Sequence, residues 1–200
     1  MPRDVAQRRL LRRGFALEWV TLGWNVVGVA VLAAAAYAAR SVALAAFGLD
    51  SLIEIGASTV VLWELSGAGE RRQRRALRLI GAAFALLAAY LAVQSTAVLV
   101  TGYHPGPSPA GIAWTAVTAV VMFALAFGKR RTGIALGNPV LRAEGRVTAI
   151  DAFLATAVLA GLAANVTLGW WWADPLAGYV LVGYGAREAW VNLSPAGGFT

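Results

Sequence analysis

Long apolar stretches alternate with short polar connections along the whole chain. Each stretch has about the length that an α-helix needs to cross a bilayer, which is roughly 20 residues. Glycine and proline mark turns in the connections at 102–109 and 169–175. The pattern therefore predicts an all-α, polytopic membrane protein with six transmembrane helices, at residues 15–38, 42–65, 76–101, 111–127, 139–166 and 172–192. In the fifth span the apolar part begins at Val147.

Composition agrees with a membrane setting. Hydrophobic residues make up 59% of the chain and charged residues only 14%, whereas soluble domains have about 25% charged residues. The mean hydropathy is +0.66. The chain has no cysteine, so disulfides and thiolate metal sites are excluded.

The basic residues predict an orientation. Sixteen of the 17 fall on one side of the predicted membrane: five before the first span, five around the second connection, five around the fourth connection (beginning with Lys129) and Arg187. Only Arg40 falls on the other side. The positive-inside rule then places both termini in the cytoplasm. The same clusters explain the pI of about 10.8 by topology and contact with anionic lipid, so we expect no nucleic-acid partner.

Three carboxylates lie deep inside the predicted spans. Asp50 and Glu54 are four residues apart in the second span and therefore share one helix face. Asp151 lies near the same depth in the fifth span. A charged side chain at bilayer mid-depth costs about 2.5–3.5 kcal/mol on insertion scales, and such residues usually mark an ion or proton path. Three buried like charges do not stay ionised together without a partner, so we expect a divalent cation or shared protons between them.

Further polar residues flank this layer. Glu18, Thr21 and Asn25 form one polar stripe along the first span, and Glu144 lies two turns before Asp151. We interpret Glu18, Asn25 and Glu144 as auxiliary ligands or as the lining of a cytoplasmic entrance. No nucleophile–base pair or histidine lies in a span, since the single histidine, His104, is in a loop. The sequence thus predicts neither catalytic residues nor an enzyme.

The second span carries a specific motif, ALAAFGLDSLIEIGAS at residues 43–58, and it resembles the membrane domain of the cation diffusion facilitator family. Residues 141–151 resemble the entry to that family's fifth span, and residues 173–183 resemble its sixth. The resemblance implies a homodimeric exporter that exchanges zinc or a related divalent ion for protons. It assigns metal binding to Asp50, Glu54 and Asp151.

The chain departs from the family pattern at the fourth ligand. The family places a ligand four residues before Asp151, where this chain has Val147, which cannot bind metal. The second acidic position is also Glu54 rather than the commoner aspartate. By this resemblance residues 1–14 are a basic cytoplasmic N-terminus, 15–192 the six-helix transport domain and 193–200 a short cytoplasmic tail. The family's cytoplasmic metal-binding domain is expected to be absent.

These observations predict a secondary transporter that exports divalent cations such as zinc in exchange for protons. Two alternatives stay open: a metal- or proton-sensing membrane protein or partner subunit that transports nothing, and a proton-coupled exporter of organic cations. The expected partners are the lipid bilayer, the divalent cation, protons and a second copy of the chain, with no cofactor required. The expected location is the cell inner membrane or plasma membrane.

Overall fold

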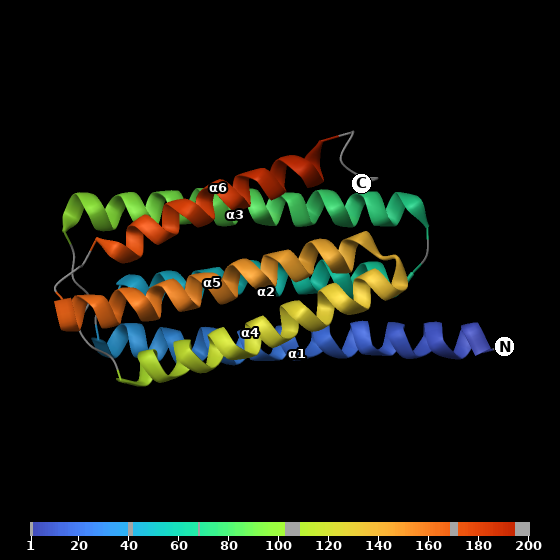
Figure 1. Cartoon of the computed structure of the whole chain (residues 1–200), viewed down its shortest axis with the longest axis horizontal. Helices are drawn as coiled ribbons and strands as arrows, with labels where there is room; N and C mark the ends of the chain where they lie inside the picture. The colour runs from blue at the N-terminus through green and yellow to red at the C-terminus, as the bar shows by residue number, and fades with distance from the viewer. Residues whose placement is uncertain (1, 40–41, 68, 103–108, 169–171, 195–200) are drawn as a thin grey trace.

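The computed structural model describes residues 2–39, 42–67, 69–102, 109–168 and 172–194. In this part of the chain all regular structure is helical, as predicted (Figure 1). His104 lies outside the described residues, and so do Trp170 and Trp171, for which the sequence predicts an anchor at the membrane interface. The helices are α1 (Pro2–Ala39), α2 (Val42–Leu65), α3 (Glu70–Thr101), α4 (Pro109–Leu136), α5 (Pro139–Leu168) and α6 (Ala173–Leu193).

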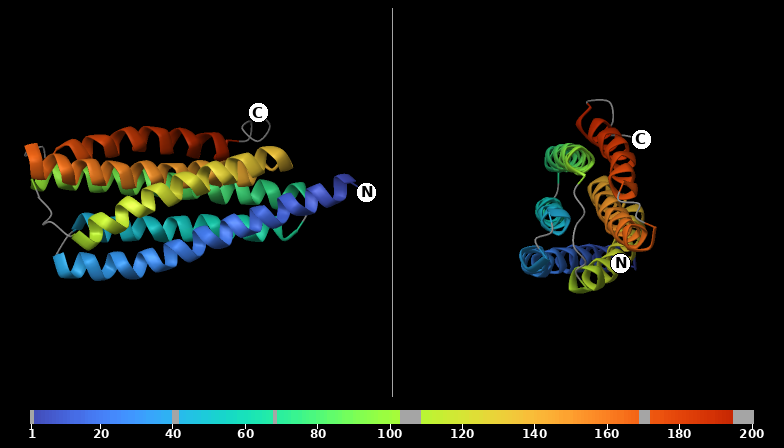
Figure 2. Two further views of the ribbon diagram at one scale, coloured as in Figure 1. Left: turned by 60° about the horizontal axis from the view of Figure 1, so that its bottom comes forward. Right: turned by 90° about the vertical axis from the view of Figure 1, so that its left-hand side faces the viewer.

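The helices run along one another in a single bundle (Figure 1), and the most extensive contacts join α4 with α5, α3 with α6 and α1 with α2. The end-on view in Figure 2 shows α2 and α3 on one side of the bundle and α5 and α6 on the other. Helix α5 is central, because it packs against α2, α3, α4 and α6. Helix α6 runs back toward the end of the bundle at which α1 begins.

Local sequence fixes the tight hairpin between α4 and α5. Gly137 has a φ of 64°, a left-handed conformation that glycine adopts without steric cost. The next residue, Asn138, accepts a 2.9 Å hydrogen bond on its side chain from the backbone N–H of Leu141 and so caps the start of α5. Pro139 then takes the first helical position, where its missing N–H is not needed. This short connection holds the two helices side by side.

The outside of the bundle exposes large apolar side chains, and its interior holds charged and hydroxyl side chains as well as an apolar core. Exposed residues include Tyr37, Val93, Val100, Val120 and Trp190, whereas the buried set contains many charged and hydroxyl side chains. Three described helical segments are long and apolar enough to cross a membrane: Val5–Ala38, Glu70–Thr101 and Pro109–Leu136. The chain is therefore a multi-pass membrane protein, while the count of six spans and the cytoplasmic termini stay predictions.

Three helices extend well beyond the predicted spans, and one of them is α3, which begins at Glu70 rather than at residue 76. Helix α1 begins at Pro2 rather than at residue 15, and α4 continues to Leu136 rather than ending near residue 127. Arginine, lysine, alanine and leucine are good helix formers, so a helix does not end where its apolar run ends. The extension of α4 matters most, because it brings Lys129 into the helix and onto its buried face.

Candidate functional site

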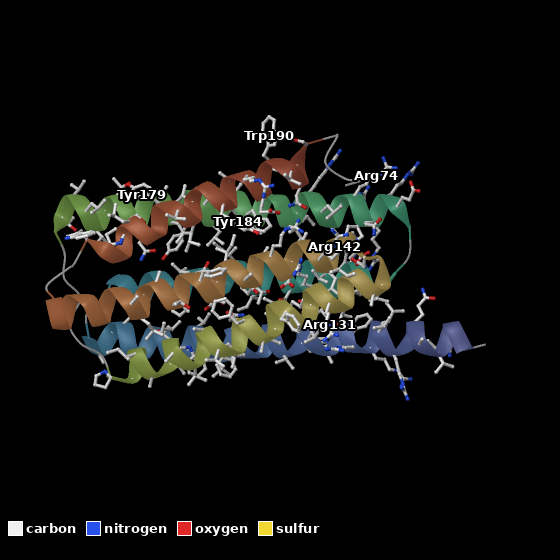
Figure 3. The ribbon with its side chains drawn as sticks, viewed as in Figure 1. Arg74, Arg131, Arg142, Tyr179, Tyr184 and Trp190 are labelled. Atoms are coloured by element: carbon white, nitrogen blue, oxygen red, sulfur yellow. The ribbon has the colours of Figure 1, made fainter. Side chains whose placement is uncertain are left out.

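Lys129 lies on a buried stripe that runs along α4. The stripe repeats every three or four residues, and it contains Thr115, Thr118, Ala119, Met122, Leu125, Ala126, Lys129, Thr132 and Gly133. The neighbouring Arg130 and Arg131 point away from it and are exposed; Figure 3 labels Arg131. The sequence interpretation that grouped Lys129 with the cytoplasmic arginines is therefore corrected. Its spacing of seven residues from Met122 and four from Leu125 is a signal from which its buried position could have been predicted once α4 was known to continue past residue 127.

The ammonium group of Lys129 is surrounded by carboxylates from three other helices. It contacts Glu144 Oε1 of α5, lies 3.2 Å from Glu18 Oε2 of α1 and 4.0 Å from Glu54 Oε1 of α2. It also donates a 3.0 Å hydrogen bond to the Thr148 hydroxyl. These side chains have at most 2% of their surface exposed. We call Lys129, Glu18, Glu54, Glu144 and Thr148 the lysine cluster.

Hydroxyl groups complete the lysine cluster. Thr148 donates a 2.5 Å hydrogen bond to Glu54 Oε1, which joins α5 to α2. Ser58, one turn from Glu54, donates a 3.3 Å hydrogen bond to Glu144 Oε1. The cluster thus connects α1, α2, α4 and α5 in a bundle interior where an unpaired charge is costly.

Two glycines let the helices approach closely enough to build this cluster. A Cβ atom at Gly145 of α5 would lie 3.2 Å from the backbone nitrogen of Arg130 and 3.2 Å from the Cβ of Lys129. A Cβ atom at Gly128 of α4 would lie 3.0 Å from a methyl group of Leu17 on α1. Gly145 follows Glu144, and Leu17 precedes Glu18. The close helix contacts therefore lie directly beside the charged residues that pair across them.

Asp50 and Asp151 form a second group, which we call the aspartate pair. Their carboxyl groups, on α2 and α5, are close enough to interact with each other, and Glu54 interacts with both. Each aspartate is at most 2% exposed. Within the described residues, Asp50 Oδ2, Glu54 Oε2 and both carboxylate oxygens of Asp151 have no hydrogen-bond partner. Buried oxygens of this kind are uncommon in folded proteins and are a feature of functional sites.

The structure therefore brings the three predicted ligands into one buried region. Within the described residues, no group of three or more acidic or histidine side chains is arranged to hold a metal ion. One oxygen of Glu54 is engaged by Thr148 and lies near Lys129, on the side of the lysine cluster. Glu54 is thus shared between the lysine cluster and the aspartate pair.

The auxiliary residues have different positions. Glu18 and Glu144 belong to the lysine cluster, whereas Asn25 is buried and donates a 3.0 Å hydrogen bond to the backbone carbonyl of Thr21 in its own helix. Val147 belongs to the apolar core, and it is the next residue, Thr148, that contacts Glu54. Sequence reasoning did not find Thr148 as a contact of Glu54, because a threonine in an apolar helix is common.

Other ion pairs lie away from the lysine cluster. Arg146 of α5 contacts Glu188 of α6 at 2.6 Å, and Arg187 lies 3.5 Å from the same carboxylate. Arg74 and Glu70 form an exposed pair at 2.9 Å within α3. Figure 3 labels Arg74, Arg131 and Arg142, which lie in the half of the bundle where α1 begins.

A bundle with an apolar exterior and buried carboxylates defines a membrane protein built around an internal polar site. Comparison with protein families matches residues 76–196 to the cation efflux transmembrane domain, which is more than half of the 200 residues. The chain belongs to this family of cation transporters. The matched range contains Lys129, Glu144 and Asp151, whereas Asp50 and Glu54 precede it. A search of curated proteins finds no match.

Proposed function

We propose that this protein exports divalent metal cations, with zinc as the best candidate, in exchange for protons. Asp50, Glu54 and Asp151 would bind the ion between α2 and α5. The observation that carries the proposal is the presence of buried carboxylate oxygens without hydrogen-bond partners in the described part of an apolar bundle. A divalent cation or protons would satisfy these oxygens and reduce their mutual repulsion.

The type of ligand sets an expectation for the substrate. Three carboxylates without histidine or cysteine form a hard, oxygen-only site, which is less selective than one containing imidazole. Zinc accepts carboxylate oxygens and can complete its coordination with water. We therefore expect zinc to be bound alongside other divalent ions rather than to their exclusion.

Exchange for protons has a simple electrostatic basis. Carboxylates in a low-dielectric bundle must be neutralised, and a bound metal ion and bound protons are two alternative ways to do so. An ion that leaves such a site is replaced by protons. Net movement of metal in one direction then accompanies movement of protons in the other.

The test is zinc flux in liposomes containing the purified protein, measured with and without an imposed pH gradient. We expect zinc uptake into the vesicles to be driven by an outward proton gradient. Asp50→Asn and Asp151→Asn should each abolish most of the flux and of the zinc binding, because each removes a charge with little change in shape. Glu70→Gln is the matched control, since Glu70 is an exposed residue of α3 and should leave both unchanged.

Different outcomes separate the alternatives. Zinc binding without flux would favour a sensor or partner subunit, and proton-driven flux of organic cations without metal binding would favour the third possibility. Unchanged zinc binding in both aspartate variants would remove the carboxylates from any metal role. As a member of this family the protein would act as a homodimer in the cell inner or plasma membrane, which cross-linking in native membranes would test.

A further inference from the structure

A buried ammonium group lies beside the candidate cation site. The Lys129 ammonium group is fully buried and contacts carboxylates of α1 and α5. It lies 4.0 Å from Glu54 Oε1. Glu54 would supply the third carboxylate of a metal site, beside the two of the aspartate pair. A positive charge beside a cation site repels the bound cation and also attracts the carboxylates that would bind it.

The hydrogen bonds of Glu54 also connect it to Lys129. Thr148 donates to Glu54 Oε1 at 2.5 Å and accepts from Lys129 at 3.0 Å, so this oxygen is linked to the ammonium group through the threonine as well as directly. The other oxygen, Oε2, has no hydrogen-bond partner among the described residues. Glu54 thus has one carboxylate oxygen held by Thr148 and Lys129 and the other available to a metal ion at the aspartate pair.

The described residues around Glu54 include no group arranged to hold a metal ion, although three acids interact there. One oxygen of Glu54 is bonded by Thr148 and lies 4.0 Å from the Lys129 ammonium group. Lys129 and a metal ion would therefore draw on the same carboxylate.

We propose that Lys129 is a tethered cation that competes with the transported ion for Glu54. In the absence of metal, Lys129 and Thr148 hold Glu54; a divalent ion binds when Glu54 leaves them and joins Asp50 and Asp151. Glu18 and Glu144 keep the ammonium group in place after Glu54 has left, so Lys129 is not left without a carboxylate partner. The inference rests on the proposed function, and it assigns to Lys129 the setting of the site's affinity.

The test is the zinc affinity of the purified full-length protein at pH 7.5, measured by titration calorimetry. Lys129→Met keeps an unbranched side chain of similar length and removes the charge. We expect it to bind zinc about tenfold more tightly, because removing a competing charge a few ångströms from the site has a large effect at low dielectric. Lys129→Arg keeps the positive charge, so its zinc affinity should stay within about twofold of the wild-type affinity.

Arg146→Met is the matched control, because it also removes one positive charge from a buried carboxylate, but that carboxylate is Glu188. It should leave zinc affinity unchanged. A second variant acts in the opposite direction: Glu18→Gln removes one partner of Lys129, so the ammonium group should hold Glu54 more strongly and zinc affinity should fall severalfold. Glu188→Gln is its control and should have no effect.

A purely structural Lys129 predicts that every change in the lysine cluster weakens binding. The inference would be overturned if the Lys129→Met variant folds and binds zinc no more tightly than the wild type. Should Lys129→Met not fold, unchanged affinity in Glu18→Gln would overturn it instead. The proposed function fails by a different result, namely zinc binding that survives in both Asp50→Asn and Asp151→Asn.

Discussion

Lys129 of α4 and Glu18 of α1 form an ion pair of 3.2 Å between side chains with no exposed surface. The two residues are 111 positions apart in the chain, and both lie at the crossing of α1 and α4 where Gly128 meets Leu17. A buried pair of this kind is strongly destabilising to break, because the remaining charge is left without compensation. Lys129 therefore has a structural part in joining the helices as well as its proposed part in the site.

Removing one carboxylate from the lysine cluster should destabilise the bundle. Glu144→Leu takes away the acceptor that Lys129 contacts directly and that Ser58 also bonds. Because Lys129 keeps Glu18 and Glu54 as partners, we expect a loss of about 1.5–3 kcal/mol, typical of a buried hydrogen bond to a charged group, seen as a fall of the thermal unfolding midpoint in detergent. Glu70→Leu breaks only an exposed pair in α3 and should change stability by less than about 1 kcal/mol. Equal effects of the two changes would contradict the role of the cluster in joining the helices.

A larger side chain at Gly145 should separate α4 from α5. Gly145→Leu would place atoms against the backbone of Arg130 and the Cβ of Lys129, which a Cβ alone already approaches to 3.2 Å. The expected result is a protein with a lower unfolding midpoint and weaker zinc binding, since Lys129 and Glu144 would no longer meet. Gly23→Leu is the control, because a Cβ at Gly23 meets nothing within 4 Å. A stable Gly145→Leu protein with normal binding would show that this close approach is not needed.

The six-span topology can be tested by single cysteines, since the chain has none of its own. We expect Val5→Cys and Ser194→Cys to be labelled only from the cytoplasmic side, because the arginine clusters place the N-terminus there and an even number of spans brings the C-terminus to the same side. Ala110→Cys, at the start of α4, should be labelled only from the outside. The measurement is labelling of intact cells by an impermeant maleimide, compared with labelling of permeabilised cells. External labelling of residue 5 or 194 would contradict the predicted orientation.

Histidine substitutions can show which residue of α5 faces Glu54. Thr148 contacts Glu54, whereas Val147 lies in the apolar core. Thr148→His should therefore place an imidazole beside Glu54, three residues from Asp151 on the same face, and increase zinc affinity over magnesium, because zinc accepts nitrogen ligands. Val147→His should instead bury an unpaired imidazole, and so lower the unfolding midpoint without a gain in zinc affinity.

The opposite result is equally informative. A gain in zinc affinity with Val147→His and none with Thr148→His would mean that Val147 faces the site, as the resemblance to the family implies. The register of α5 against α2 would then differ by one residue from that in the structure. Circular dichroism of both variants controls for loss of helical structure.

Local pattern was enough to predict the class of protein and its candidate ligands. Apolar stretches of membrane length predict helices wherever they occur, because the backbone must satisfy its own hydrogen bonds in lipid. A carboxylate within such a stretch is expensive, so Asp50, Glu54 and Asp151 could be identified without any tertiary information. Their common depth followed from counting residues along each helix.

The partner of these acids was decided by the tertiary structure. Lys129 is followed by two arginines, and in sequence it has the appearance of a charged helix end; only the direction of its side chain from α4 separates it from exposed Arg130 and Arg131. That direction depends on how α4 crosses α1 and α5, which Gly128 and Gly145 permit through contacts far apart in the chain. The chain by itself therefore determined which segments form helices and which of them carry charged residues. Helix packing alone decided which charges meet, because an ion pair depends on distances in space rather than on spacing in sequence.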